Sequence, residues 1–272
     1  MNFVDKLLSA SRKNKSLLCV GLDPNPKFMP PKLSLYEFNR EIIDATSDIV
    51  CAYKPNLAFY EALGIEGLKA LEKTLMHIPK AIPAIGDAKR GDIASSSEAY
   101  AIALFETFNF DAATVNPYLG HDSVAPFIAY TNKGVFLLCK TSNAGSADFQ
   151  ETLCSEASNA GVRPLFERVA IKAREWNVHS NIGLVVGATF PGQLKRVREL
   201  CPELPLLIPG IGTQGGDLAA VIRDGVDANK EKVIINCSRQ ILYASRGNDF
   251  AQAARREALK LHGRISEQLA IK

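Results

Sequence analysis

The feature that most constrains the fold is a repeated alternation of short apolar runs with longer amphipathic stretches. Between the runs, apolar residues recur at helical spacing, as at Phe166, Val169 and Ala173. The chain is therefore predicted to alternate strands with helices. The runs expected to form strands are Leu17–Gly21, Cys51–Lys54, Ile82–Asp87, Ala113–Asn116, Val135–Lys140, Gly183–Gly187, Leu206–Pro209 and Val233–Cys237.

The predicted strands are continuous apolar runs, which is typical of parallel strands covered by helices. Eight strand–helix units in 272 residues match the size of an α/β fold of the (β/α)8 TIM barrel type. Asn2–Ser11 is expected to form an extra N-terminal helix. An open doubly wound sheet is the alternative. No Ser/Gly-rich linker or block of charge divides the sequence, so residues 1–272 are expected to form a single barrel domain.

Composition and charge exclude several classes of protein. Lys and Arg number 32 against 29 Asp and Glu, which gives no basic footprint for nucleic acid. No apolar run approaches the roughly 20 residues of a membrane span, and the N-terminus lacks the pattern of a signal peptide. We therefore expect a cytoplasmic protein with no membrane partner.

The cysteines and histidines do not have the spacing of metal ligands. None of the 6 cysteines forms a CxxC pair, and none of the 4 histidines has an i, i+4 partner. Reduced thiols and no metal site are expected.

Polar residues gather where the predicted strands end. Asp23, Lys54, Asp87 and Asn116 follow or close four of the apolar runs. Charged groups at the ends of apolar strands are costly unless they are paired. Because active sites of (β/α)8 barrels lie at the carboxyl ends of the strands, these residues predict a site there.

The densest motif is Ile85-Gly-Asp-Ala-Lys-Arg-Gly-Asp-Ile93. Asp87 and Lys89 are two residues apart at a strand end, so their side chains should point the same way, and Lys54 ends the preceding strand. With Asp92 these residues form a cluster of alternating charge, in which each carboxylate favours the protonated form of its neighbouring lysine. A charged lysine in a partly dry cavity can donate a proton to a carbanion. The alternative is a buried ion-pair network that braces the barrel.

The second motif, Pro209-Gly-Ile-Gly-Thr-Gln-Gly-Gly-Asp217, contains the GxGxxG pattern. It follows the seventh predicted strand, and the eighth ends at Ser238 and Arg239, where a dinucleotide site would carry an acid. A phosphate site is the better interpretation, because barrels commonly bind phosphate after strands seven and eight. Glycine N–H groups, Arg239 and Gln214 would hold the anion. The alternative is a tight turn.

Three weaker signals suggest contacts to the rest of a ligand. Lys140-Thr-Ser-Asn143 could bind a neutral polar head such as a base, Asp23 could accept from sugar hydroxyls, and Asn56 offers a further polar contact. Each could equally be a capping or turn residue.

With these motifs the chain resembles the orotidine 5′-phosphate decarboxylase family, specifically its alternate bacterial (type 2) subfamily. The Asp87-Ala-Lys-Arg-Gly-Asp-Ile93 signature is the most specific part. The resemblance implies cofactor-independent decarboxylation of orotidine 5′-phosphate to UMP in pyrimidine biosynthesis. The matching segments, in chain order, are Val20-Gly-Leu-Asp-Pro24, Tyr53-Lys-Pro-Asn56, Gly86–Ile93, Thr114-Val-Asn-Pro117, Pro209–Asp217 and Ser238-Arg239.

The resemblance also implies a role for each matching residue. Lys89 would protonate C6 of the pyrimidine, and Asp87 would lie against the substrate carboxylate. Lys54 would bind Asp87 and a ribose hydroxyl. Asp92 would reach the site of a second subunit, which implies a homodimer. The remaining substrate-binding residues would be Asp23 at the ribose, Ile93 and Ser142 at the base, Ser96 from the partner copy, Gln214 and Arg239 at the phosphate, and Asn56, Pro209 and Ser238 beside them.

Other functions on the same barrel stay open at this point. A metal-dependent sugar-phosphate decarboxylase or aldolase, a Schiff-base aldolase and a non-catalytic nucleotide-binding module are the alternatives. The metal-free cluster of alternating charge argues against the first of these.

Overall fold

Eight parallel strands form a nearly closed (β/α)8 TIM barrel in the computed structural model, which describes residues 1–155, 161–212 and 215–271. The strands are hydrogen-bonded in the order β2-β1-β10-β9-β8-β5-β4-β3. Isolated bridges from Tyr53 to Ala84 and from Asn56 to Asp87 join the two outermost strands. The predicted fold class is therefore confirmed. The barrel strands are β1 Leu18–Leu22, β2 Ala52–Pro55, β3 Ile85–Arg90, β4 Ala112–Val115, β5 Gly134–Lys140, β8 Ile182–Val186, β9 Leu206–Pro209 and β10 Val233–Cys237.

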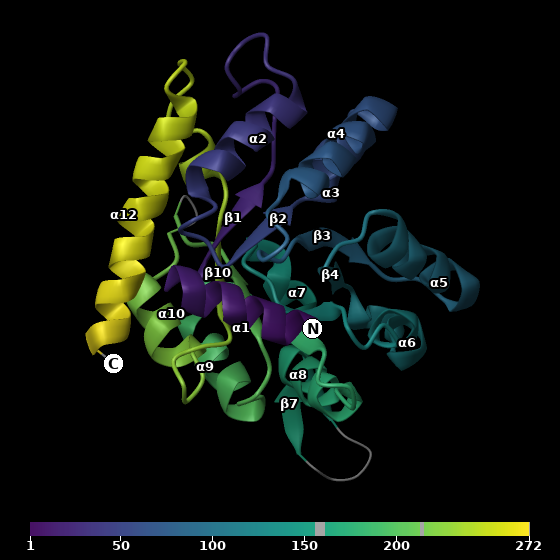
Figure 1. Ribbon diagram of the computed structural model, residues 1–272. Coiled ribbons are helices and arrows are strands. Elements are labelled where there is room, and N and C mark those ends of the chain that lie inside the picture. The colour runs from purple at the N-terminus through teal and green to yellow at the C-terminus, as the bar shows by residue number, and fades with distance from the viewer. Residues whose placement is uncertain (156–160, 213–214, 272) are drawn as a thin grey trace.

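Helices surround the barrel, and the long helix α12 (Phe250–Ile271) runs along its outside (Figure 1). None of the helices in the described ranges is both long enough and apolar enough to cross a membrane. The other α-helices are α1 Phe3–Asn14, α2 Leu35–Thr46, α3 Leu57–Glu61, α4 Gly64–His77, α5 Ala94–Ile102, α6 His121–Ile128, α7 Ala147–Gln150, α8 Leu165–Trp176, α9 Pro191–Leu200, α10 Leu218–Gly225 and α11 Arg239–Leu242.

Shorter elements lie in three of the connections. A π-helical turn η1 (Ala103–Thr107) extends α5, and 3-10 turns η2 (Pro117–Leu119) and η3 (Ala144–Ser146) follow β4 and β5. An antiparallel hairpin of β6 (Leu153–Ser155) and β7 (Val162–Pro164) stands between β5 and β8. The sequence did not indicate this hairpin, because each of its strands has only three residues and their large apolar side chains, Leu153 and Val162, are exposed.

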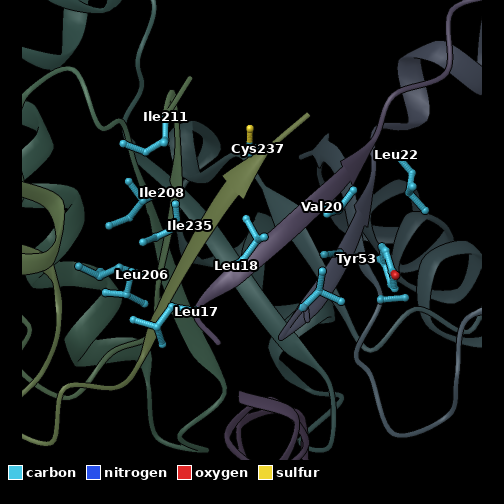
Figure 2. Packing of buried hydrophobic residues seen from close by; sticks show 14 of the residues in the cluster. Leu17, Leu18, Val20, Leu22, Tyr53, Leu206, Ile208, Ile211, Ile235 and Cys237 are labelled. Atoms are coloured by element: carbon cyan, nitrogen blue, oxygen red, sulfur yellow. The ribbon is translucent and has the colours of Figure 1, made fainter. Parts of the chain in front are cut away.

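Alternate residues of each strand face opposite layers, as strand geometry requires. Leu18, Val20 and Leu22 of β1 belong to the large cluster between the strands and the helices, part of which Figure 2 shows. Cys19, by contrast, belongs to a second cluster of buried side chains drawn from the barrel strands and α1. This second cluster fills the interior of the barrel.

Helix α1 closes the amino-terminal end of that interior. Its Phe3 ring packs edge-on against Phe136 of β5, with ring centroids 5.6 Å apart, and Leu7 joins the same cluster. Asn2 caps the helix by accepting the Asp5 N–H at 2.9 Å. The extra N-terminal helix is confirmed, although it ends at Asn14 rather than Ser11, with a left-handed residue at Lys15.

The predicted ends of β3 were wrong by three residues. Ile82–Asp87 was expected, but the strand runs from Ile85 to Arg90, because the Ile82 N–H bonds back to the Pro79 carbonyl in a turn. The strand also shifts register between Gly86 and Arg90, and Lys89 has a left-handed backbone with φ of 49°. The regular pleat assumed for Asp87 and Lys89 is therefore interrupted.

Candidate active site

Two adjoining cavities open at the carboxyl ends of the barrel strands, where the sequence predicts the site. They have volumes of about 200 Å³ and 310 Å³, and both are lined by Lys54, Asp87 and Pro209. The first continues to Asp23, Asn56, Gly210, Ile211, Asn236, Cys237, Ser238, Arg239 and Gln240. The second continues to Lys89, Thr114, Leu138, Thr141, Ser142, Asn143, Val185 and Leu207.

Strand alternation explains why these side chains meet. Ala52 and Ile85 belong to the interior cluster, so Lys54 and Asp87, two residues further along β2 and β3, also point inward at the open end. The interior of the barrel is thus apolar beside α1 and polar where the strands end.

Asp87 bridges two lysines at the junction of the cavities. Lys54 Nζ donates to Asp87 Oδ2 at 2.6 Å, and Lys89 Nζ contacts Asp87 Oδ1. The Lys54 side chain is only 4% exposed, whereas the Lys89 side chain is 50% exposed. One lysine is therefore a fixed buried partner, and the other presents its ammonium to the cavity.

Electrostatic interactions keep Asp87 and Lys54 in their charged forms. Burial by itself would raise the pKa of Asp87, but the ammonium groups of Lys54 and Lys89 outweigh it and hold that pKa well below its usual value. Burial would likewise lower the pKa of Lys54, but Asp87 and Asp23 hold it above the ordinary value. Asp87 is therefore an anion throughout the neutral pH range.

The first cavity presents a cation next to a glycine-bearing loop. Arg239 is exposed, lines this cavity and has no carboxylate partner among the described residues. Gly210 and Gly212 have φ angles of 104° and 101°, a conformation that side chains disfavour. Gln214, the other predicted phosphate ligand, lies outside the described residues. The part that is described suits an anion.

The second cavity has an apolar floor and a polar edge. Leu138, Val185 and Leu207 line one part, while Thr141, Ser142 and Asn143 line another. Three of the four residues of the predicted polar motif thus line this cavity. Lys140 is the exception, because it is fully buried and lines neither cavity.

Three of the predicted site residues are not brought into the cavities by the single chain. Asp92, Ile93 and Ser96 line neither of them. Among the described residues Asp92 accepts only the N–H of Ile93, at 2.8 Å, and Ile93 is 59% exposed. These residues follow β3 at its open end, and the sequence-based prediction gave two of them to a neighbouring subunit.

The sequence over most of the chain decides between the possible families. Residues 16–256 match the profile of the "Orotidine 5'-phosphate decarboxylase / HUMPS family". The chain belongs to this family. An orotidine 5′-phosphate decarboxylase of Dehalococcoides mccartyi (strain ATCC BAA-2100) is 53% identical over 266 residues, or 98% of each chain, and that of Roseiflexus sp. (strain RS-1) is 49% identical over 275 residues, or 99% of each.

Solved structures of this family have the same fold. The Leishmania donovani OMP decarboxylase is 40% identical, covers 99% of both chains and superimposes with a TM-score of 0.85. A Toxoplasma gondii structure titled as a putative orotidine-monophosphate decarboxylase is 36% identical, covers 99% of this chain and 96% of its own, and has a TM-score of 0.89. The alternative of a metal-dependent sister enzyme is not favoured.

No side chains among the described residues are placed to form a metal centre. We find no group of three or more His, Cys, Asp and Glu side chains arranged to hold an ion in residues 1–155, 161–212 and 215–271. The expectation that the protein uses neither metal nor cofactor stays a prediction.

Thr114 is a residue of the site to which the sequence analysis gave no role. It is 1% exposed on β4, and its hydroxyl accepts the N–H groups of Ala88 and Lys89 at 3.0 Å and 2.9 Å. The same hydroxyl donates to Asp87 Oδ1 at 3.1 Å. One side chain therefore holds both the left-handed backbone of Lys89 and the carboxylate that Lys89 contacts. The sequence could have indicated this role, because Thr114 carries a hydroxyl at an inward-facing position of β4, the strand next to that of Asp87.

Replacing Thr114 with valine is expected to lower kcat for the proposed substrate about 10- to 100-fold. Valine keeps the shape but loses the three hydrogen bonds, so Asp87 and Lys89 lose their alignment. Thr114→Ser keeps the hydroxyl and should retain most of the activity. Steady-state kinetics of both variants check this, and a serine variant that loses activity while the valine variant keeps it would show that the methyl group matters instead.

Asp23 is expected to reduce stability at neutral pH. Burial raises its pKa, although Lys54 and Ser238 oppose the shift, and its Oδ1 is buried without a partner among the described residues. The unfolded chain releases this proton near its ordinary pKa of about 3.9, before the folded protein does. Ionisation of Asp23 therefore costs stability as the pH rises above about 4.

Asp23→Asn removes that cost. The difference in free energy of unfolding, variant minus wild type, should become more positive between pH 4 and pH 7 in urea titrations. A flat or falling difference would show that the carboxyl is not desolvated. The same substitution should weaken binding of UMP, because the proposed acceptor for the ribose becomes a neutral amide.

Proposed function

We propose that the protein catalyses the cofactor-independent decarboxylation of orotidine 5′-phosphate to UMP in pyrimidine biosynthesis. The observation that carries the proposal is the Lys54–Asp87–Lys89 arrangement, in which a half-exposed ammonium faces the cavity beside a fixed carboxylate. Such a group can stabilise and then protonate a carbanion. Full-length similarity to orotidine 5′-phosphate decarboxylases supports the same assignment.

The two cavities provide for the three parts of this substrate. Arg239 and the loop that begins at Gly210 would hold the phosphate, and Asp23 with Lys54 would hold the ribose. The pyrimidine would lie on the apolar floor of the second cavity, with Ser142 at its polar edge. The substrate would thus extend from an anion site to the reacting ammonium.

The reaction needs no group beyond these side chains. The bond from C6 to the carboxylate breaks, CO₂ leaves, and the electron pair stays on C6. Lys89 then gives a proton from Nζ to C6, which yields UMP, and the amine regains a proton from water. Because the ammonium is already in place, its charge stabilises the transition state more than the ground state.

We further propose that the site is completed in a homodimer. Asp92 would approach Lys89 of a second copy, and Ser96 would donate a hydroxyl there. Ile93 would line the base pocket. The segments that follow β3 and β4 carry several exposed large apolar side chains, which a second copy could cover. These are Ile93, Tyr100, Ile102, Tyr118 and Leu119.

Three finer assignments accompany the proposal. The Asp87-Ala-Lys-Arg-Gly-Asp-Ile93 signature favours the alternate bacterial subfamily. All six cysteines are free thiols, which suits a reducing cytoplasm. Residues 1–272 would act as one domain.

Direct turnover tests the proposed activity. Purified protein should convert orotidine 5′-phosphate to UMP and CO₂ at an undiminished rate with EDTA present. A rate that collapses in EDTA would point to a metal-dependent sister enzyme, and borohydride trapping of a lysine would point to a Schiff base. Tight binding of UMP without turnover would indicate a binding module.

A further inference from the structure

Lys140 at the end of β5 is a buried cation that the proposed chemistry does not use. Its side chain is 0% exposed. Nζ donates to Ser146 Oγ at 2.8 Å and lies 3.0 Å from Glu151 Oε1, and it sits 4.1 Å from the centroid of the Phe190 ring. A buried ammonium needs partners on every side, and here a hydroxyl, a carboxylate and an aromatic face provide them.

A shift in strand register directs Lys140 away from the cavity. Leu138 pairs with Val185, but Lys140 pairs with Val186, so β5 gains one residue relative to β8. Leu138 therefore faces the second cavity, whereas Lys140, two residues later, does not line it. The lysine turns instead toward the segment that follows its own strand.

That segment, residues 141–151, carries the polar edge of the second cavity and has few apolar contacts of its own. Phe149, its large apolar side chain, is 67% exposed. Its two ends are joined by Gln150, which accepts the Thr141 N–H and donates to Thr141 Oγ1, each at 2.9 Å. Ser146 and Glu151, the partners of Lys140, lie in the middle and at the end of the segment.

Further contacts of Lys140 and its partners reach the loop after β8. Phe190 lies in that loop, and Gln193 Nε2 of α9 donates to Glu151 Oε1 at 3.2 Å. Thr189 Oγ1 donates to the Ser142 carbonyl at 3.4 Å, and a Cβ at Gly187 would come within 2.7 Å of the Ser142 Cα. One buried charge thus fixes two loops whose contact sets the position of Ser142.

We propose that Lys140 is a positioning residue for recognition of the pyrimidine ring. It holds residues 141–151 so that Thr141, Ser142 and Asn143 face the base, and it does not itself touch the substrate. The inference rests on the proposed function, because it takes the occupant of the second cavity to be the base of a nucleoside monophosphate. A purely bracing role explains the arrangement less well, since a buried ion pair adds little stability over apolar packing.

Ligands with and without a base separate these roles. UMP reaches both cavities, whereas ribose 5-phosphate reaches only the first. Lys140→Met should raise the Kd of UMP and the KM of orotidine 5′-phosphate on the order of tenfold, and leave the Kd of ribose 5-phosphate within about twofold. Its kcat should fall less than its KM rises, because Lys89 and Asp87 are untouched.

A milder variant keeps the test valid if Lys140→Met does not fold. Ser146→Ala removes one partner of Lys140 and leaves the ion pair with Glu151. It should raise the Kd of UMP about two- to fivefold and leave the Kd of ribose 5-phosphate unchanged. Lys172→Met, on the exposed face of α8, is the matched control and should change neither affinity. An equal loss of affinity for UMP and ribose 5-phosphate, or no change in either affinity, would overturn the proposal.

The wild-type protein separates a failure of this inference from a failure of the proposed function. If the wild-type protein turns over orotidine 5′-phosphate but the variants do not weaken UMP more than ribose 5-phosphate, only the role of Lys140 is refuted. A wild-type protein that neither turns over this substrate nor prefers UMP to ribose 5-phosphate would refute both.

Discussion

Lys89→Ala is expected to lower kcat for orotidine 5′-phosphate by about 10⁴-fold or more. The substitution removes both the charge that stabilises the C6 carbanion and the proton that completes the reaction. The fold should persist, because Asp87 keeps its 2.6 Å contact to Lys54 and Lys89 is half-exposed. Steady-state assays and calorimetric binding of UMP measure the two effects separately.

A matched substitution shows whether the loss is specific. Lys172→Ala removes an exposed lysine from α8 and should leave kcat unchanged. UMP should still bind Lys89→Ala within about tenfold of the wild-type affinity, since the phosphate, ribose and base contacts remain. A Lys89→Ala enzyme that retains more than about 1% of wild-type kcat would exclude Lys89 as the proton donor.

Mixing two inactive variants is expected to restore activity if each site draws on two subunits. In a dimer of one Lys89→Ala chain and one Asp92→Ala chain, both substitutions fall in the same active site. The other active site has both native residues and stays intact. Random exchange of equal amounts should give about a quarter of the wild-type activity. The assay is turnover after mixing under conditions that allow subunits to exchange.

The control pair is Lys89→Ala with Asp87→Ala. These two residues serve the same site from the same chain, so every site in a mixed dimer lacks one of them and no activity should return. Differently tagged chains show whether mixed dimers form. If they form and the mixture of Lys89→Ala and Asp92→Ala still has no activity, the assignment of the partner subunit's Asp92 to the site is refuted.

The sequence predicted the barrel and the meeting of Lys54 with Asp87 because both follow from regular strand geometry. Parallel strands end at one face, and alternation sends Lys54 and Asp87 inward. Lys140 could not be placed in this way, because the register shift after Leu138 interrupts the alternation. The displaced bounds of β3 have a similar cause, since the turn after Pro79 delays the strand and Lys89 leaves the regular pleat.

Asp92 illustrates a different limit of sequence reasoning. Asp92 is half-buried, Ile93 after it is exposed, and no contact among the described residues brings Asp92 to Lys89. The motif associated it with the cluster, but spacing along a strand cannot say which copy of the chain it serves. Thr114 was recoverable by contrast, because its inward position on β4 follows from the same alternation as Asp87.

A crystal structure of the protein with UMP would show whether Lys89 is placed to protonate C6. We expect Lys89 Nζ to lie about 3 to 3.5 Å from C6 of the bound pyrimidine, with Asp87 and the partner subunit's Asp92 both in contact with that ammonium. Arg239 should hold the phosphate at the far end of the ligand. A complex in which UMP occupies these cavities while Lys89 Nζ points to solvent, or in which C6 faces another group, would contradict it.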